Sequence, residues 1–154
     1  MSPSYPPVVR FGRVDIIMAK MNRPTNSQRI AQYYDQNTSL FMHLGGSGTG
    51  IAAIHREIWA PEVQNRRQAF EYLNHRVVEA IQPVLLPGAQ VLDFGCGLGG
   101  TTTWVAAHLP VHATGLTISQ IQVAHAARRA ARPGAGRCPG SRARRRLPAG
   151  DWME

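Results

Sequence analysis

The pattern of apolar and polar positions predicts helices in the first half of the chain. Between residues 65 and 82, apolar residues recur at spacings of three and four, which is typical of a helix with one buried face. Asn65 is the expected N-cap of this helix, and a second helix is predicted over 27–44, capped by Ser27. The apolar positions that form the predicted buried face are Phe70, Leu73, Val77 and Ile81.

Strands and helices alternate along the next part of the sequence. Short apolar runs predict strands at 91–94 and 111–116, with a helix over 99–108 between them. A further helix is predicted over 120–131, where Ser119-x-x-Gln122 has the spacing of a capping box. Such alternation is typical of an α/β fold with a parallel sheet.

The strand at 91–94 runs directly into a glycine-rich turn at 95–100. Glycines let the backbone turn tightly and approach a ligand, and the helix that follows offers free N–H groups at its N-terminus. Gly95-x-Gly97-x-x-Gly100 also fits the dinucleotide fingerprint, so the glycines alone do not identify the ligand. Asp93, just before the turn, disfavours an anionic pyrophosphate and favours a ligand that carries an ammonium and a sulfonium.

Two strings in this region resemble one family. VLDFGCGLGG resembles motif one of the class I, Rossmann-like S-adenosylmethionine-dependent methyltransferases. GLTISQIQ, at 115–122, is similar to a segment of the branch that includes cyclopropane fatty acid synthases, sterol and prenyl C-methyltransferases and tocopherol O-methyltransferases. The resemblance implies a Rossmann-like fold with an N-terminal helical cap and S-adenosyl-L-methionine as cofactor. The residues that it places at the cofactor are Asp93, Gly95, Cys96, Gly97, Gly99, Thr117, Ser119 and Gln122.

The segment ahead of the first strand extends this resemblance. YYDQNTSLFMHL followed by IHREIW is similar to the YYD-x-x-T and apolar-His-x-x-x-Trp elements of the family's cap. The resemblance implies that Tyr33 and Tyr34 cover the methionine end of the cofactor, and that His55 and Trp59 face the acceptor. Aromatic side chains at helical spacing are also explained as ordinary core positions. No catalytic residue is assigned, and the candidates for a base are His55, Asp35 and Glu57.

Charge is distributed unevenly along the chain. The net charge is +8, of which residues 128–154 contribute +6. The segment 132–148 is rich in Arg, Gly and Pro without apolar periodicity, which predicts a disordered stretch. The chain has sixteen arginines and one lysine, as expected of GC-rich coding DNA, and such DNA read out of frame yields a similar composition. We therefore expect a frame-shifted or truncated chain in which 149–154 is a remnant of the family's Gly-Asp motif, whose Asp151 would contact adenine.

The expected organisation has five parts. An irregular segment over 1–26 precedes the helical cap at 27–82 and the first half of the Rossmann-like domain at 83–131, with two or three parallel strands in all. The segments 132–148 and 149–154 follow. This organisation predicts methyl transfer to a small lipid, prenyl or natural-product acceptor, impaired by the truncation.

Two other functions remain open. An NAD(P)-dependent oxidoreductase is disfavoured by Asp93 and by the lack of an acid near Thr117. A non-catalytic basic binding protein would depend on the arginines of 128–146, but no aromatic residue interleaves with them for nucleic-acid stacking. Two cysteines and scattered histidines predict neither a disulfide framework nor a metal site. The sequence has no membrane-length apolar run and no signal-peptide core, which favours a cytoplasmic location.

Overall fold

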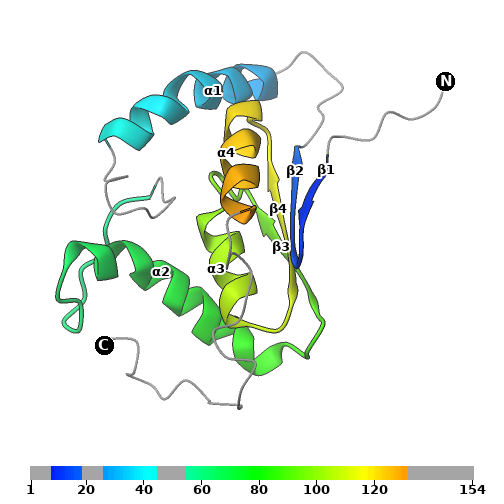
Figure 1. Cartoon of the computed structure of the whole chain (residues 1–154). Helices are drawn as coiled ribbons and strands as arrows, with labels where there is room; N and C mark the ends of the chain where they lie inside the picture. Colours follow the sequence, from blue (N-terminus) through cyan, green and yellow to red (C-terminus); the bar gives the residue numbers. More distant parts are fainter. Residues whose placement is uncertain (1–7, 19–25, 45–54, 132–154) are drawn as a thin grey trace.

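The computed structural model describes residues 8–18, 26–44 and 55–131 (Figure 1). Its strands form one four-stranded sheet. The strand order is β1-β2-β4-β3. β2, β4 and β3 run parallel, whereas β1 pairs antiparallel with β2. The α/β class and the parallel sheet are thus confirmed. The strands are β1 (Val8–Phe11), β2 (Val14–Met18), β3 (Gln90–Phe94) and β4 (His112–Thr117).

The described helices lie on one side of this sheet (Figure 1). α3 (Gly100–His108) and α4 (Gln120–Ala130) pack against the strands. α1 (Asn26–Leu44) packs on α4, and α2 (Arg66–Ile81) packs on α3. The opposite face of the sheet has no described helix over it, and there the β3 side chains Leu92 and Phe94 are 60% and 83% exposed.

The first segment, predicted to be irregular over 1–26, contains a β-hairpin. Gly12 has a φ of 59°, which suits the tight turn between β1 and β2. β2 pairs in parallel with β4 from Val14 beside Ala113 to Met18 beside Thr117. In a doubly wound sheet, in which β3 and β4 would be the first two strands, the third strand of the unit pairs with this edge of β4. The third parallel strand was expected after the helix at 120–131, but in the described structure it comes from the N-terminal hairpin.

Arg13 ties this hairpin to the end of α3. Its guanidinium donates hydrogen bonds to the carbonyl of Leu109 at 3.1 Å and to the carbonyl of Ala106 at 2.7 Å. Carbonyls at a helix C-terminus lack helical partners, and a cation there interacts favourably with the helix dipole. The position of β2 is therefore set by contacts with both the sheet and the helix layer.

Two apolar clusters fill the space between the layers. One lies between the sheet and α3 and α4, and the other joins α2 to α3 and β3. The buried stripe of α2 differs from the predicted one, because Leu73 is 37% exposed while Asn74 is buried and accepts a 2.7 Å hydrogen bond from Thr101 of α3. The buried residues of α2 are Ala69, Phe70, Asn74 and Val78.

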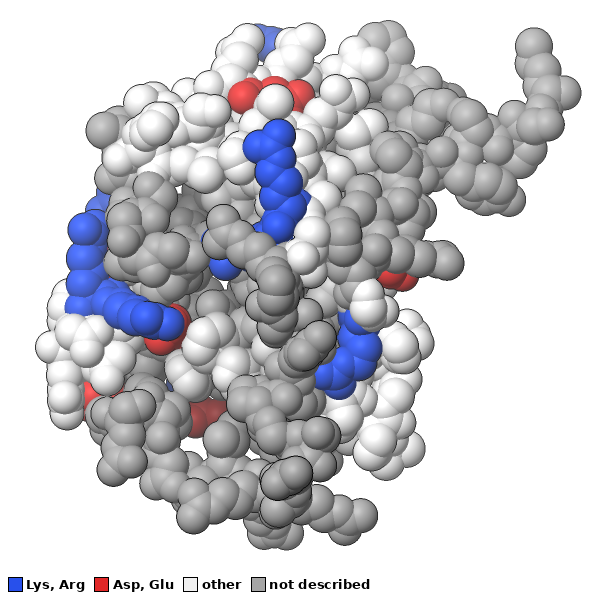
Figure 2. Space-filling model, viewed as in Figure 1, with Lys and Arg blue, Asp and Glu red and all other residues white. Residues whose placement is uncertain are grey.

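Charges of both signs are interspersed on the described surface shown in Figure 2. The arginines of α2 each have a carboxylate nearby: Arg66 lies 2.7 Å from Glu57, Arg67 lies 3.0 Å from Glu71, and Arg76 lies 2.6 Å from Glu79. Exposed pairs of this kind contribute little to stability. Among the described helices, none combines the length and the apolar composition that crossing a bilayer requires.

Candidate functional site

The glycine turn lies at the carboxyl end of β3 and is tied to the end of β4. Gly95, Gly97 and Gly99 have φ values of 89°, 53° and 73°, in the left-handed region that favours glycine. The N–H groups of Gly95 and Cys96 both donate to the carbonyl of Leu116, at 2.9 and 3.0 Å. A Cβ at Gly95 would meet no heavy atom within 4 Å, so this backbone borders open space. The turn is therefore preformed for close approach by a ligand.

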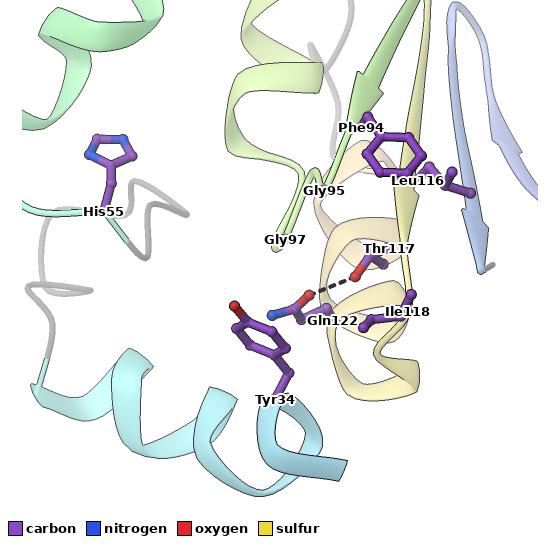
Figure 3. A pocket seen from close by; sticks show the side chains of 9 residues that line it. All are labelled: Tyr34, His55, Phe94, Gly95, Gly97, Leu116, Thr117, Ile118 and Gln122. Carbon is purple, nitrogen blue, oxygen red and sulfur yellow. Dashed lines mark hydrogen bonds between the residues drawn. The ribbon is translucent and has the colours of Figure 1, made fainter. Parts of the chain in front are cut away.

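A cavity of about 440 Å³ opens beside this turn (Figure 3). The carboxyl ends of parallel strands are where open α/β sheets bind their ligands, and this volume suits a small molecule. The Tyr34 ring projects from α1 toward the glycine turn (Figure 3). His55, from the segment before α2, also lines the cavity. The residues that line the cavity are Tyr34, His55, Phe94, Gly95, Gly97, Leu116, Thr117, Ile118 and Gln122.

Thr117 and Gln122 supply polar groups to the cavity wall. The Thr117 hydroxyl donates a 2.7 Å hydrogen bond to Gln122 Oε1 (Figure 3). Both residues are at least 95% buried, so the bond fixes the amide within the wall. Gln122 Nε2 also donates to Thr38 Oγ1 of α1, at 3.4 Å.

Ser119 acts as the N-cap of α4, as predicted. Its Oγ accepts a 3.1 Å hydrogen bond from the N–H of Gln122. In a full capping box, the Gln122 side chain would accept a hydrogen bond from the Ser119 N–H. Here the Gln122 amide oxygen accepts from Thr117 instead, and the Ser119 N–H donates to Thr117 Oγ1 at 3.3 Å. Ser119 is fully buried and does not line the cavity.

Asp93 and Cys96 are not among the residues that line the cavity. Asp93 Oδ2 accepts a 2.6 Å hydrogen bond from Thr102 Oγ1 of α3. The Cys96 side chain is directed toward Gly115. Burial, together with the negative charge of Asp93, raises the pKa of the Cys96 thiol to about 12. The thiol therefore stays protonated at neutral pH, and Cys96 offers the cavity no thiolate.

The remaining predicted residues divide between the cavity and the surface. Tyr33 is 53% exposed and packs edge-on against Tyr34, with ring centroids 5.6 Å apart, and Trp59 is 61% exposed; neither lines the cavity. His55 lines it, with Nδ1 2.9 Å from the carbonyl of Arg56. The hydrogen bond from Arg66 lowers the pKa of the Glu57 carboxyl. Asp151 lies outside the described residues, as do the predicted segments 132–148 and 149–154.

Three lining residues were not predicted as site residues: Phe94, Leu116 and Ile118. Each lies at or just after the end of a strand beside the glycine turn, and that position is a signal that the sequence contains. Within the described ranges, no three His, Cys, Asp or Glu residues are grouped so as to hold a metal ion.

The glycine turn, the parallel strands and the helical cover define a class I, Rossmann-like methyltransferase fold. The chain belongs to the mycolic acid cyclopropane synthetase family, whose family model matches residues 22–140.

Several known proteins are similar to this chain. An O-methyltransferase of Pyrenophora dematioidea is 32% identical over 112 residues, which is 69% of this chain and 38% of that protein. The O-methyltransferase rstn1 of Aspergillus nomiae is 33% identical over 66% of this chain and 42% of its own length. 24-Methylenesterol C-methyltransferase 3 of Arabidopsis thaliana is 48% identical over 40 residues, which is 26% of this chain and 11% of that protein.

A solved structure is also similar. The crystal structure of the [4+2]-cyclase SpnF matches 70% of this chain with a TM-score of 0.55 and 37% identity, and the match covers 38% of that chain. The chain thus spans about two fifths of the length of the two O-methyltransferases and of SpnF.

Proposed function

We propose that this chain forms the cofactor-binding part of an S-adenosyl-L-methionine-dependent methyltransferase that acts on a small organic acceptor. The observation that carries the proposal is the preformed glycine turn, which borders a cavity of about 440 Å³ at the carboxyl ends of β3 and β4. Family membership and the methyltransferase relatives support the same activity.

The residues of the cavity fit this cofactor. Open space beside Gly95 lets a ligand approach the backbone. Thr117 and Gln122, bonded to each other, form a polar part of the wall against which the sugar and base would lie. The Tyr34 ring can cover the ligand from the opposite side. When bound, S-adenosyl-L-methionine supplies a methyl group on a positively charged sulfur.

Asp93 has a distinct role in the proposal. Its carboxylate precedes the turn and supplies negative charge at the end of the site where the cofactor's ammonium would lie. The hydrogen bond from Thr102 holds this carboxylate in one orientation.

We also propose that Gly97, Gly99 and the backbone of Cys96 bind the cofactor as parts of the turn. Contact of Tyr33, Ser119 and Asp151 with the cofactor, and of Trp59 with the acceptor, remains a prediction from the sequence.

The acceptor that we propose is a lipid, a prenyl compound or another natural product. Phe94, Leu116 and Ile118 give the cavity an apolar wall, and no Asp, Glu, Lys or Arg is among the residues that line it in the described part of the chain. His55 is the candidate base among the lining residues. The names of the relatives, which include a sterol C-methyltransferase, support this class. The cytoplasmic location and the impairment of this chain by truncation remain predictions from the sequence.

The first test is calorimetric titration of S-adenosylhomocysteine into the wild-type chain and the variant Asp93→Asn. The asparagine retains an oxygen for the Thr102 hydroxyl but removes the charge, so we expect affinity to fall about tenfold without loss of the fold. Glu79→Ala is the matched control, because it removes an exposed carboxylate that pairs with Arg76 on α2. Its affinity should equal that of the wild type.

The same titrations distinguish the alternatives. A folded wild-type chain that binds NADH and not S-adenosylhomocysteine would favour the oxidoreductase. Retention on a polyanion column, without binding of either nucleotide, would favour the basic binding protein. Methyl-labelled cofactor and a panel of lipid acceptors then test transfer itself, which binding alone does not distinguish from a reaction such as the cyclisation named for SpnF.

A further inference from the structure

Asp35 of α1 joins the first helix to the N-terminus of α4. Asp35 Oδ1 accepts a 2.5 Å hydrogen bond from Ser119 Oγ and a 3.2 Å hydrogen bond from the N–H of Ile121. Both donors belong to the first turn of α4, where free N–H groups and the helix dipole favour a carboxylate. A side chain distant in the sequence thus completes the cap that Ser119 begins.

One turn further along α1, Thr38 forms a second connection. This residue is fully buried, and its hydroxyl accepts from Gln122 Nε2 at 3.4 Å and donates to the carbonyl of Tyr34 at 2.6 Å. Gln122 in turn accepts from Thr117 at the end of β4. Hydrogen bonds therefore run continuously from the sheet, through α4, to the backbone of the residue whose ring lines the cavity.

These contacts are the principal attachment of α1. Among the described elements, α4 is the one against which α1 packs extensively. Tyr34 is 36% exposed and reaches the cavity from α1 (Figure 3), whereas Asp35 and Thr38 do not line the cavity. The orientation of α1 on α4 therefore decides whether the Tyr34 ring faces the glycine turn.

We propose that Asp35 and Thr38 are positioning residues that fasten α1 to the start of α4 and so hold Tyr34 against the bound cofactor. The proposal rests on the proposed cofactor site, which it deepens by assigning a role to two residues outside the cavity wall. Asp35 was a candidate base in the sequence analysis. In this proposal it instead attaches α1 to α4, because its Oδ1 accepts hydrogen bonds from two donors of α4.

The test compares Asp35→Ala with Asp35→Asn in the full chain. Asparagine offers an oxygen that can accept both hydrogen bonds, whereas alanine offers none. We expect S-adenosylhomocysteine to bind about tenfold more weakly to Asp35→Ala and within about threefold of wild type to Asp35→Asn. An equal loss in both variants would show that the charge itself is required, and would overturn the positioning role.

A double-mutant cycle links the effect to Tyr34. If Asp35 acts through the tyrosine ring, Asp35→Ala should lower affinity in the wild-type background and have no further effect in a Tyr34→Ala background. Additive losses would overturn the proposal. Asn37→Ala is the matched control, because it removes a 2.8 Å hydrogen bond to the carbonyl of Tyr33 on the same helix without touching α4. It should leave affinity unchanged.

Hydrogen–deuterium exchange separates this proposal from the cofactor proposal. Peptides from 26–44 should exchange faster in Asp35→Ala than in wild type or Asn37→Ala, because the attachment of α1 is weakened. Unchanged exchange in Asp35→Ala would refute the attachment, whatever the protein binds. Faster exchange in a protein whose wild type binds no S-adenosylhomocysteine would refute the cofactor site and leave the attachment standing.

Discussion

Gly115 lies in β4, directly beneath the glycine turn, where a side chain has no room. A Cβ at this position would lie 2.8 Å from Cys96 Sγ and 3.0 Å from Thr102 Oγ1. It would also lie 3.0 Å from Cys96 Cβ, whereas nonbonded carbon atoms prefer separations of about 3.5–4.0 Å, so the Cys96 side chain would have to move. We expect Gly115→Ala to lower the free energy of unfolding by about 2 kcal/mol, as overpacked cores do.

Thermal unfolding followed by circular dichroism measures this loss. For a chain of this size, about 2 kcal/mol corresponds to a decrease in Tm of about 4–8 °C. Thr102 holds the Asp93 carboxylate, and Cys96 belongs to the turn, so affinity for S-adenosylhomocysteine should fall as well. Replacing the thiol as well, in Gly115→Ala/Cys96→Ala, should recover part of the stability.

Gly88→Ala is the control for backbone strain alone. Gly88 has a φ of 82°, and a Cβ there would meet nothing within 4 Å, so we expect a cost of about 1 kcal/mol. A Tm for Gly115→Ala within about 1 °C of wild type would refute the close packing of β4 beneath the turn.

Two further predictions concern the hairpin and the thiol. Arg13→Ala should destabilise the protein by about 1–3 kcal/mol in urea unfolding, because it removes both hydrogen bonds to the end of α3; an unchanged midpoint would contradict this anchoring. Since the pKa of Cys96 is raised to about 12, iodoacetamide at about pH 8 should leave it unmodified in a Cys138→Ser background, and labelling as fast as that of an unfolded control would count against its burial. The same shift predicts that stability falls as pH rises above the ordinary thiol pKa of 9.0 toward 12, because the unfolded chain releases the proton first.

The elements from α2 to α4 could be predicted closely because their limits are set by local signals. Asn65 accepts from the N–H of Gln68, and Ser119 accepts from the N–H of Gln122, as expected of N-caps. Gly99, at a φ of 73°, precedes the first residue of α3. Each of these signals acts within a few residues, so the sequence alone contains it.

The hairpin could not be predicted in the same way. The residues 14–18 are held by pairing with β4 and by the Arg13 contacts with α3, both of which involve partners far away in the sequence. The buried stripe of α2 was partly wrong for a related reason, since its rotation is set by packing on α3. Spacing shows that a helix has an apolar face, but the neighbours decide which residues are covered.

The candidate site shows the same division. The glycine turn and its place after a strand follow from the order of residues. The order of residues does not show which tyrosine lines the cavity, because Tyr33 and Tyr34 are adjacent. The packing of α1 on α4 places Tyr34, and not Tyr33, in the cavity wall. The partnership of Asp35 with Ser119 likewise joins residues that no local pattern connects.

The pairing of β2 with β4 has a consequence for how the chain folds. Val14 finds its partner at Ala113, about one hundred positions later, so the sheet has a high contact order. At a synthesis rate of 5–20 residues per second, β2 would wait about 5–20 s on the ribosome before β4 exists. During that interval the strand, which includes Ile16 and Ile17, remains without its parallel partner. Pairing of β2 with β4 should therefore be slow compared with the formation of the helices, and chaperones that shield apolar segments during synthesis should raise the yield.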